Sequence, residues 1–265
     1  MKNIVLLVHD DNGQEARLRV ALDLARALEG HLTCIDVTVL PMVIADMYGG
    51  ADQALLIAEE QEREAQHRSA LQQRLATENV SWNSVQLTGD ISRAVIEYST
   101  LADVIVLNRQ LEERSLPDMR GITSRIVMET KAPVVAVPEG QEGFGTRRAL
   151  IAWDASVSCA AALRASVPLL RLASEVRIFT VTGKSDTANL EPAAQYLLHH
   201  GVHGAVESIA ADGRDTWDVI AGECGRWNAD YLVMGAYGRG RLREAFGGVT
   251  KHMLSTSSVP VVLAH

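Results

Sequence analysis

The sequence predicts an α/β protein made of two tandem domains, each a doubly wound parallel sheet covered by helices. Short apolar runs alternate along the chain with longer stretches of helical periodicity. Several of these runs are continuous rather than alternating, which is typical of parallel strands that helices cover on both faces. The strand–helix pattern also occurs twice, and such alternation gives a doubly wound sheet with right-handed crossovers.

The duplication is visible as an internal repeat with one constant offset. Three blocks of the first half recur 127 residues later without a gap. Apolar strands resemble one another, so one match would carry little weight, but a shared register across separate blocks argues for a repeat. The matching pairs are 102–106 with 229–233, 121–123 with 248–250, and 133–135 with 260–262.

The first half contains the predicted elements of one complete domain. Its first helix follows apolar residues at helical spacing, namely Ala16, Val20, Leu24 and Leu28. The predicted strands of this half are 4–10, 32–40, 81–87, 104–108 and 133–137, and the predicted helices are 14–29, 54–75, 92–99 and 123–130.

The second half repeats this order after a linker. Segment 138–145 holds three glycines and one proline, which are typical of a connection between domains. We therefore place the domains at 1–140 and 146–265. Pro168 should kink or end the first helix of the second domain. The predicted strands are 149–154, 175–181, 206–210, 231–235 and 260–264, and the predicted helices are 160–173, 216–227 and 250–257.

Composition excludes several classes of protein. The 265-residue chain has a formal net charge of -8 and a pI of about 5.5, so its field opposes nucleic acid and anionic lipid. No apolar run approaches the roughly 18 residues of a membrane span, and the first run is too short for a signal peptide. Cys34, Cys159 and Cys224 lack metal-ligand spacing and suit a reducing compartment. We expect a soluble cytoplasmic protein.

One predicted strand of the second half runs through a glycine-rich loop into the final helix. Glycines let a ligand approach the backbone closely, and the N–H groups and dipole of a helix start favour an anion. Open parallel sheets bind ligands at the carboxyl ends of their strands, near the point where strand order reverses. The loop has neither Walker A spacing nor a dinucleotide fingerprint, and the alternative is a flexible surface loop. Its candidate binding residues are Gly235, Gly238, Gly247, Gly248, Val249 and Thr250.

At these residues the sequence resembles the universal stress protein family, and as two tandem domains the resemblance covers the whole chain. The ATP-binding members carry G-x2-G, nine residues, then G-[ST]. Here Gly235 and Gly238 match the opening, and 247–250 is similar to the closing G-S-V-T. The resemblance implies a Rossmann-like, adenine nucleotide alpha hydrolase-like fold that binds ATP, with or without Mg²⁺. It also implies that Asp154 lies near adenine and ribose and that the backbone around Val181 contacts adenine.

The loop departs from the family pattern in two ways. Only eight residues separate Gly238 from Gly247, and Gly248 stands where the family has a hydroxyl-bearing residue. The loss of one neutral hydrogen bond costs about 0.5–1.5 kcal/mol, which weakens binding without abolishing it. Arg239 and Arg241 are candidate phosphate contacts, although solvated charges on a loop are the simpler interpretation.

The first half has lost the glycine pattern. A β-carbon at the lost positions should block a phosphate or strain the backbone. We therefore expect no ATP binding in the first half. In the 127-residue register, Asn108, Leu111 and Arg120 stand at the positions of Gly235, Gly238 and Gly247.

The sequence shows no convincing catalytic constellation. Ser156 follows Asp154 without a nucleophile elbow and is predicted to cap a helix, and His199 and His200 are assigned to a helix end rather than to a metal. The leading hypothesis is an ATP-binding stress-response or signalling module with at most slow hydrolysis. Its halves should pair through their last strands, and its chains should form a homodimer. The alternatives are a nucleotide-free interaction scaffold and a weak ATPase or adenylylating enzyme.

Overall fold

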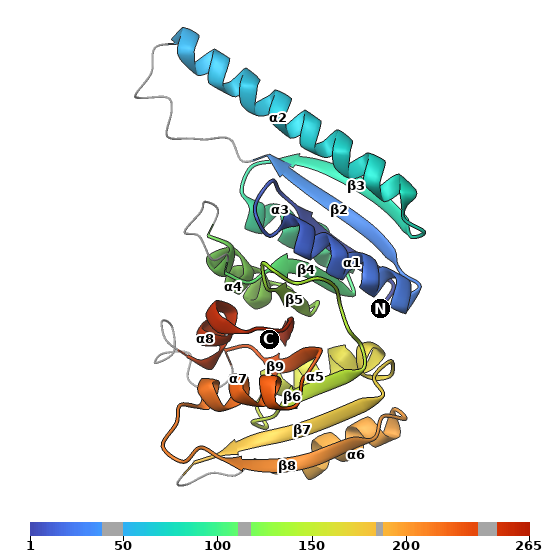
Figure 1. Cartoon of the computed structure of the whole chain (residues 1–265), viewed down its shortest axis with the longest axis vertical. Helices are drawn as coiled ribbons and strands as arrows, with labels where there is room; N and C mark the ends of the chain where they lie inside the picture. Colours follow the sequence, from blue (N-terminus) through green and yellow to red (C-terminus); the bar gives the residue numbers. More distant parts are fainter. Residues whose placement is uncertain (39–49, 111–117, 184–187, 238–247) are drawn as a thin grey trace.

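The strands form one ten-stranded sheet in the order β3-β2-β1-β4-β5-β10-β9-β6-β7-β8 (Figure 1). The computed structural model describes residues 1–38, 50–110, 118–183, 188–237 and 248–265, with the side chains of 50–61 and 64 excepted. Strands β1–β5 come from the first half of the chain and β6–β10 from the second. The two halves therefore lie side by side in one sheet, as two tandem doubly wound units.

The elements of the first half alternate as the sequence predicts. They are β1 (Asn3–Val8), α1 (Gln14–Leu28), β2 (His31–Thr38), α2 (Gly50–Thr77), β3 (Ser81–Thr88), α3 (Ile91–Tyr98), the short 3-10 helix η1 (Ser99–Leu101), β4 (Val104–Asn108), α4 (Met119–Glu129) and β5 (Val134–Val137).

The second half repeats the order. It contains β6 (Arg148–Ala152), α5 (Val157–Leu170), β7 (Glu175–Thr182), α6 (Glu191–His199), β8 (Gly204–Ala210), α7 (Thr216–Arg226), β9 (Tyr231–Gly235), α8 (Val249–Thr256) and β10 (Val261–Ala264). The predicted domain boundary, between 140 and 146, falls between β5 and β6 and stays a prediction.

The halves join through their last strands, as the sequence analysis expected. Strand β10 pairs with β5 antiparallel, whereas the neighbouring strands within each half pair parallel. Val262 lies opposite Val135 at the centre of this pairing, and these two residues correspond in the 127-residue repeat. A pseudo-two-fold axis therefore passes through this pair and relates the two halves.

Each central strand contributes side chains to two cores, one on each face of the sheet. Leu6 of β1 packs in the core under α1 and α5, while its neighbours Val5 and Leu7 pack in the core under α3, α4, α7 and α8. A strand buried on both faces needs apolar side chains at successive positions, which explains its continuous apolar run.

At α4 and α5, a side-chain cap explains why the helix begins earlier than the sequence predicts. Helix α4 begins at Met119, earlier than predicted, because the Asp118 carboxylate accepts a hydrogen bond from the N–H of Gly121. Helix α5 begins at Val157, after the Ser156 cap that the sequence predicted. Pro168 lies in the last turn of α5, in line with an early end. For α6, the sequence predicts a helix end at His199 and His200 but no starting residue.

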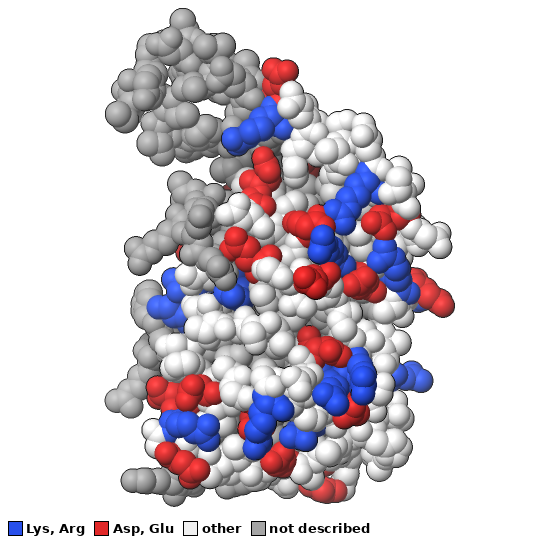
Figure 2. Space-filling model, viewed as in Figure 1, with Lys and Arg blue, Asp and Glu red and all other residues white. Residues whose placement is uncertain are grey.

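Figure 2 shows how charged side chains are distributed over one face of the molecule. On the face shown in Figure 2, acidic and basic side chains are intermixed over both halves. This pattern agrees with a chain that has no broad basic field for a polyanion. None of the helices in the described ranges combines the length and the apolar character that a membrane span needs.

Candidate functional site

The second half has a crevice at the carboxyl ends of its central strands. Its volume is about 150 Å³, roughly that of a cavity that accommodates a benzene ring. After β6 the chain first adds β7 on one side and later β9 on the other, so strand order reverses at β6 and the crossover helices diverge there. The lining residues are Ala152, Trp153, Asp154, Cys159, Phe179, Thr180, Val181, Thr216, Ile220, Met234, Gly235, Val249 and Thr250.

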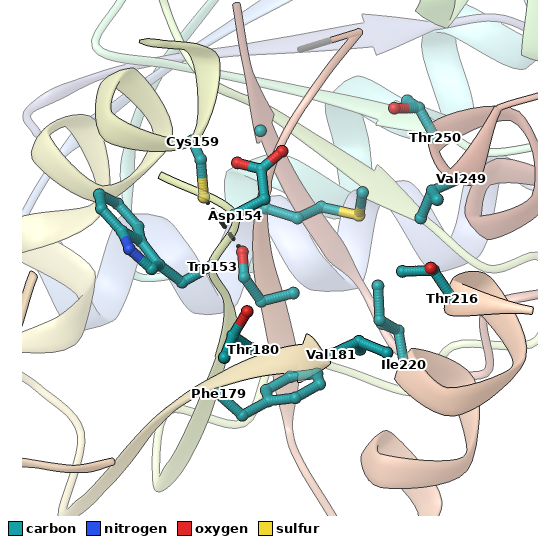
Figure 3. Close-up of a pocket in the computed structure, with 13 residues that line it drawn as sticks. Trp153, Asp154, Cys159, Phe179, Thr180, Val181, Thr216, Ile220, Val249 and Thr250 are labelled. Carbon is teal, nitrogen blue, oxygen red and sulfur yellow. Dashed lines mark hydrogen bonds between the residues drawn. The ribbon is translucent and has the colours of Figure 1, made fainter. Parts of the chain in front are cut away.

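One side of the crevice is apolar. Phe179 and Val181 come from the end of β7 and lie beside Ile220 of α7 (Figure 3). Trp153 closes another side, and its indole N–H donates to the carbonyl of Asn189 at 3.0 Å. An apolar slot with few polar groups is the usual environment for a flat heterocycle.

Asp154 supplies the negative charge of the site. It directly follows Trp153 at the end of β6, and Figure 3 shows its carboxylate pointing into the open space between Cys159 and Thr250. One carboxylate oxygen accepts the N–H of Ser156 at 2.9 Å, and the Ser156 hydroxyl accepts the N–H of Cys159 at 3.1 Å. The loop that starts α5 therefore fixes the Asp154 side chain, and the predicted capping role of Ser156 is confirmed.

Gly235 lets two elements approach closely. A β-carbon at this position would lie 2.7 Å from Cys159 Cα, which is far inside van der Waals contact. The start of α5 therefore rests directly on the end of β9, and only glycine permits this packing. The structure thus gives Gly235 a packing role, while its predicted contact with a nucleotide stays a prediction.

The start of α8 forms one end of the crevice. Gly248 is the N-cap residue and provides no side-chain cap. The N–H groups of Val249 and Thr250, at the first two helical positions, have no acceptor within the helix. Together with the helix dipole they favour an anion. The Thr250 hydroxyl accepts the N–H of Tyr237 at 3.2 Å, which ties the end of the β9 loop to this helix start.

The backbone directly after β9 offers less to an anion than the sequence suggested. The N–H of Ala236 donates to the carbonyl of Ala264 at 2.9 Å, and that of Tyr237 is bonded to Thr250. Two amides that follow Gly235 are therefore satisfied within the protein. Among the described residues, the helix start at Val249 and Thr250 is left as the source of backbone donors.

The structure brings together five of the predicted site residues and leaves four outside its description. Asp154, Val181, Gly235, Val249 and Thr250 all line the crevice, and Gly248 directly precedes the last two. The predicted positions outside the described residues are Gly238, Arg239, Arg241 and Gly247.

Sequence reasoning missed part of the lining. Trp153, Cys159, Phe179, Thr216 and Ile220 also face the crevice. Trp153 is adjacent to Asp154, and Thr216 begins a helix at the same edge of the sheet. Their places at the ends of predicted elements were the available signal.

The thiol of Cys159, which lines the crevice, is unreactive. Burial raises the pKa of Cys159 to about 12, and the nearby Asp154 charge raises it as well. The thiol donates a hydrogen bond to the carbonyl of Ala152 at 3.1 Å. A protonated, buried thiol is a poor nucleophile. The described residues also contain no group of three His, Cys, Asp or Glu placed to hold a metal ion.

The first half fills the corresponding place with an arginine. Arg17 of α1 is 0% exposed, and its guanidinium is surrounded by oxygen acceptors. It donates to both carboxylate oxygens of Asp11 at 2.8 and 2.9 Å and to the side chain of Asn108. Its other acceptors are the carbonyls of Leu7 and His9 and the amide oxygen of Gln14. Among the described residues of the first half, this cluster lies at the same edge of the sheet as the crevice of the second half.

Asn108 and Asp11 correspond to key residues of the second half. Asn108 stands at the position of Gly235, and Asp11 accepts the N–H of Gly13 two residues on, as Asp154 accepts that of Ser156. Burial lowers the pKa of Arg17, while the paired Asp11 charge works in the opposite direction. The first half therefore keeps the acidic residue of the site and uses it to hold an internal cation.

The second half of the chain matches a known family. Residues 145–265 match the model of the universal stress protein family. No curated protein matches the sequence.

Solved structures of similar fold extend over the whole chain. A universal stress protein from Archaeoglobus fulgidus superposes with a TM-score of 0.78 at 17% identity, covering 100% of this chain and 98% of that one. A putative universal stress protein from Pseudomonas aeruginosa gives a TM-score of 0.61 at 17% identity, covering 99% and 93%. A universal stress protein in complex with cAMP covers 45% of this chain and 97% of its own at 17% identity, with a TM-score of 0.37. The first two likenesses show the fold, and no residue correspondence is taken from the third.

Proposed function

We propose that the chain binds ATP in the crevice of its second half, because residues 145–265 match the model of the universal stress protein family and the first half repeats their fold. In this proposal the protein is a nucleotide-responsive stress-response or signalling module of the cytoplasm. Its three free thiols suit a reducing compartment. The homodimer expected from the sequence stays a prediction.

The observation that carries the proposal is the arrangement of three different chemistries around one crevice. An apolar slot beside Val181 suits the adenine ring, and the Asp154 carboxylate suits ribose hydroxyls, which donate hydrogen bonds. The start of α8 suits the phosphates. A small volume of about 150 Å³ fits a base inside the slot, with the phosphates extending over the helix start.

Local donors have to overcome an unfavourable overall field. The chain carries a net charge of -8, so a nucleotide is held by the amides and dipole of α8 rather than by long-range attraction. Gly248 lacks the hydroxyl of the family pattern, which removes about 0.5–1.5 kcal/mol if one neutral hydrogen bond is lost. Any Mg²⁺ would arrive with ATP and remain bound mainly by phosphates and water.

We assign no catalysis to the crevice. Its described lining contains one carboxylate, a protonated thiol and threonine hydroxyls. None of these forms a nucleophile–base pair of the kind that activates an attacking group. A bound nucleotide would therefore act as a signal rather than as a substrate.

An ATP titration followed by calorimetry tests the proposal. The variant Val181→Trp fills the slot from the rim of the sheet, and Val206→Trp places the same side chain on β8, where Val206 is 52% exposed. We expect the wild type and Val206→Trp to bind alike and Val181→Trp to bind at least about tenfold more weakly. Equal affinity in all three proteins, or no binding by any of them, would contradict the proposal.

One observation favours the scaffold alternative. The amides of Ala236 and Tyr237 are satisfied internally, which leaves fewer donors for phosphates than a complete loop would offer. Native mass spectrometry of the freshly purified chain separates the two functions. A mass increase equal to an adenine nucleotide supports the proposal, whereas the bare mass in the presence of added ATP supports the scaffold.

A further inference from the structure

The pseudo-two-fold axis relates two grooves where the halves meet, although the Tyr231 that contacts Phe144 in one is replaced by the buried Val104 at the other. Each groove runs between the first helix of one half and the start of the fourth strand of the other. The correspondence is close, because Asp103 and Asp230 both accept the N–H of the residue that opens the neighbouring first strand. The distance from the backbone nitrogen to the carboxylate oxygen is 2.9 Å for Asn3 and Asp103 and 2.8 Å for Arg148 and Asp230.

One groove is filled by the linker between the halves. Phe144 is 6% exposed, its N–H donates to the Asp23 carboxylate of α1 at 2.9 Å, and its ring lies 5.1 Å from that of Tyr231 at the start of β9. The flanking Gly143 and Gly145 have no room for a β-carbon, which would lie 2.6 Å from Asp23 and Asp230 respectively. An extended segment with a buried aromatic ring thus occupies this groove completely.

The other groove is open. It lies between α5 and the start of β4, and its volume is about 650 Å³. The lining residues are Met1, Ile96, Ser99, Thr100, Ala102, Asp103, Glu129, Thr130, Lys131, Ala132, Pro133, Arg164, Ala165 and Pro168.

The walls of the open groove offer apolar surface and an unused backbone acceptor. Leu101, between two lining residues, is 83% exposed, and its counterpart in the second half is the polar Asn228. Pro168 has no N–H to donate to the carbonyl of Arg164 four residues earlier, so this carbonyl lacks its helical partner. An exposed apolar residue and a free acceptor are what an extended peptide would bury and pair.

The charges of the open groove favour an acidic ligand. The Glu129 carboxylate pairs with Arg125 at 3.0 Å, and Asp103 accepts two backbone N–H groups. Within the described ranges, Lys131 and Arg164 form no ion pair with a carboxylate, since the nearby Glu129 pairs with Arg125 instead. The acids of the groove are therefore engaged, whereas its two cations are available to a ligand.

We infer that the open groove binds an extended segment of a partner protein that carries an aromatic side chain beside acidic residues. The linker that fills the equivalent groove has this composition, with Glu142 two residues before Phe144. Its sequence from Pro138 to Gly145 therefore provides a probe peptide of the expected chemistry. The ring would enter the apolar part of the groove, and the acids would face Lys131 and Arg164.

Fluorescence anisotropy of this labelled linker peptide with the full chain tests the inference. We expect saturable binding that weakens about tenfold when the peptide phenylalanine is replaced by alanine. Ala165→Trp should block the groove, and Arg164→Glu should weaken binding about tenfold. The matched control is Arg214→Glu, an exposed arginine of the second half that donates to the backbone carbonyls of Ala210 and Ala211, and it should bind like the wild type.

A charge exchange makes the result specific. Arg164→Glu should recover affinity for a peptide in which lysines replace the two glutamates, and circular dichroism should show unchanged folding of both groove variants. Absence of saturable binding to the wild type overturns the inference. So does binding that is insensitive to Ala165→Trp and Arg164→Glu, because the peptide would then have displaced the linker from its own groove.

Discussion

The two halves share strand order and helix placement, yet the carboxyl edges of their sheets differ in what they hold. The second half has an open crevice beside Asp154 and the start of α8. The first half has Arg17, fully buried, with its guanidinium bonded to Asp11 and Asn108. The same fold therefore has an open crevice beside its acidic residue in one copy and an internal ion pair in the other.

The difference can be traced to one position of the repeat. Gly235 allows the start of α5 to rest on β9, whereas Asn108 places a side chain there. The first half compensates at Gly13, where a β-carbon would lie 2.5 Å from the Asn108 side chain. The glycine of this contact thus lies at the strand end in the second half and at the helix start in the first half. The buried side-chain oxygen of Asn108 needs a hydrogen-bond donor, and Arg17 provides it.

The largest expected effect comes from removing the internal cation of the first half. Arg17→Met leaves the Asp11 carboxylate buried without its partner, which should lower the free energy of unfolding by about 3–5 kcal/mol. Chemical denaturation measures this loss. The control Arg93→Met removes an exposed helix pair with Glu97 and should leave the stability nearly unchanged, because solvent screens such a pair. Equal effects of the two substitutions would contradict the assigned role of Arg17.

The next effect should come from Gly235→Ala. The new methyl group would overlap the backbone of α5 at Cys159, and such overpacking should cost about 1–3 kcal/mol. Gly222→Ala is the control, because nothing lies within 4 Å of its β-carbon and alanine favours a helix by roughly 0.5–1 kcal/mol. A Gly235→Ala protein as stable as the wild type would show that the close approach of β9 and α5 is not required.

Asp154→Asn should separate ligand binding from stability. Asparagine retains an oxygen that can accept the Ser156 N–H but loses the charge that strengthens hydrogen bonds to ribose hydroxyls. ATP affinity should fall about tenfold in calorimetry, with the melting temperature unchanged. The counterpart Asp11→Asn should do the reverse, lowering stability through Arg17 without changing ATP affinity. An unchanged ATP affinity in Asp154→Asn would remove the carboxylate from the proposed site.

The smallest effect should be the same in both halves. Burial raises the pKa of Cys34 in the first half, and of Cys159 and Cys224 in the second, to about 12 from the ordinary value of 9.0. A folded-state pKa above the unfolded one gives stability that is complete below pH 9 and is lost as the pH rises toward 12.

Each buried thiol should therefore lower the free energy of unfolding by about 1 kcal/mol when the pH rises from about 8 to 10. In urea denaturation, Cys34→Ala and Cys224→Ala should each reduce the pH dependence of the free energy of unfolding by the contribution of one thiol. If only one of the two substitutions does so, the halves differ beyond their crevices.

Much of the fold could be predicted from the sequence because periodicity and the 127-residue repeat carry it. Val135 and Val262, paired at the centre of the sheet, already correspond in that repeat. The start of α4 at Met119 was missed because Asp118 caps it beyond the periodic segment. Periodicity reports which side chains are buried, whereas a cap depends on a single hydrogen bond.

The candidate site was partly predictable. Asp154, Val181 and Gly235 lie at strand ends that the alternation of elements places together. The role of Arg17 was not predictable, because its partner Asn108 is 91 residues away in the chain and no local pattern marks a buried arginine. The satisfied amides of Ala236 and Tyr237 likewise depend on contacts with β10 and α8.

The number and place of bound nucleotides test the central contrast most directly. Equilibrium dialysis with radiolabelled ATP should give one nucleotide per chain for the wild type and for Asp11→Asn, and none for Val181→Trp. Two nucleotides per chain in the wild type, or one retained by Val181→Trp, would contradict the assignment of binding to the second half alone.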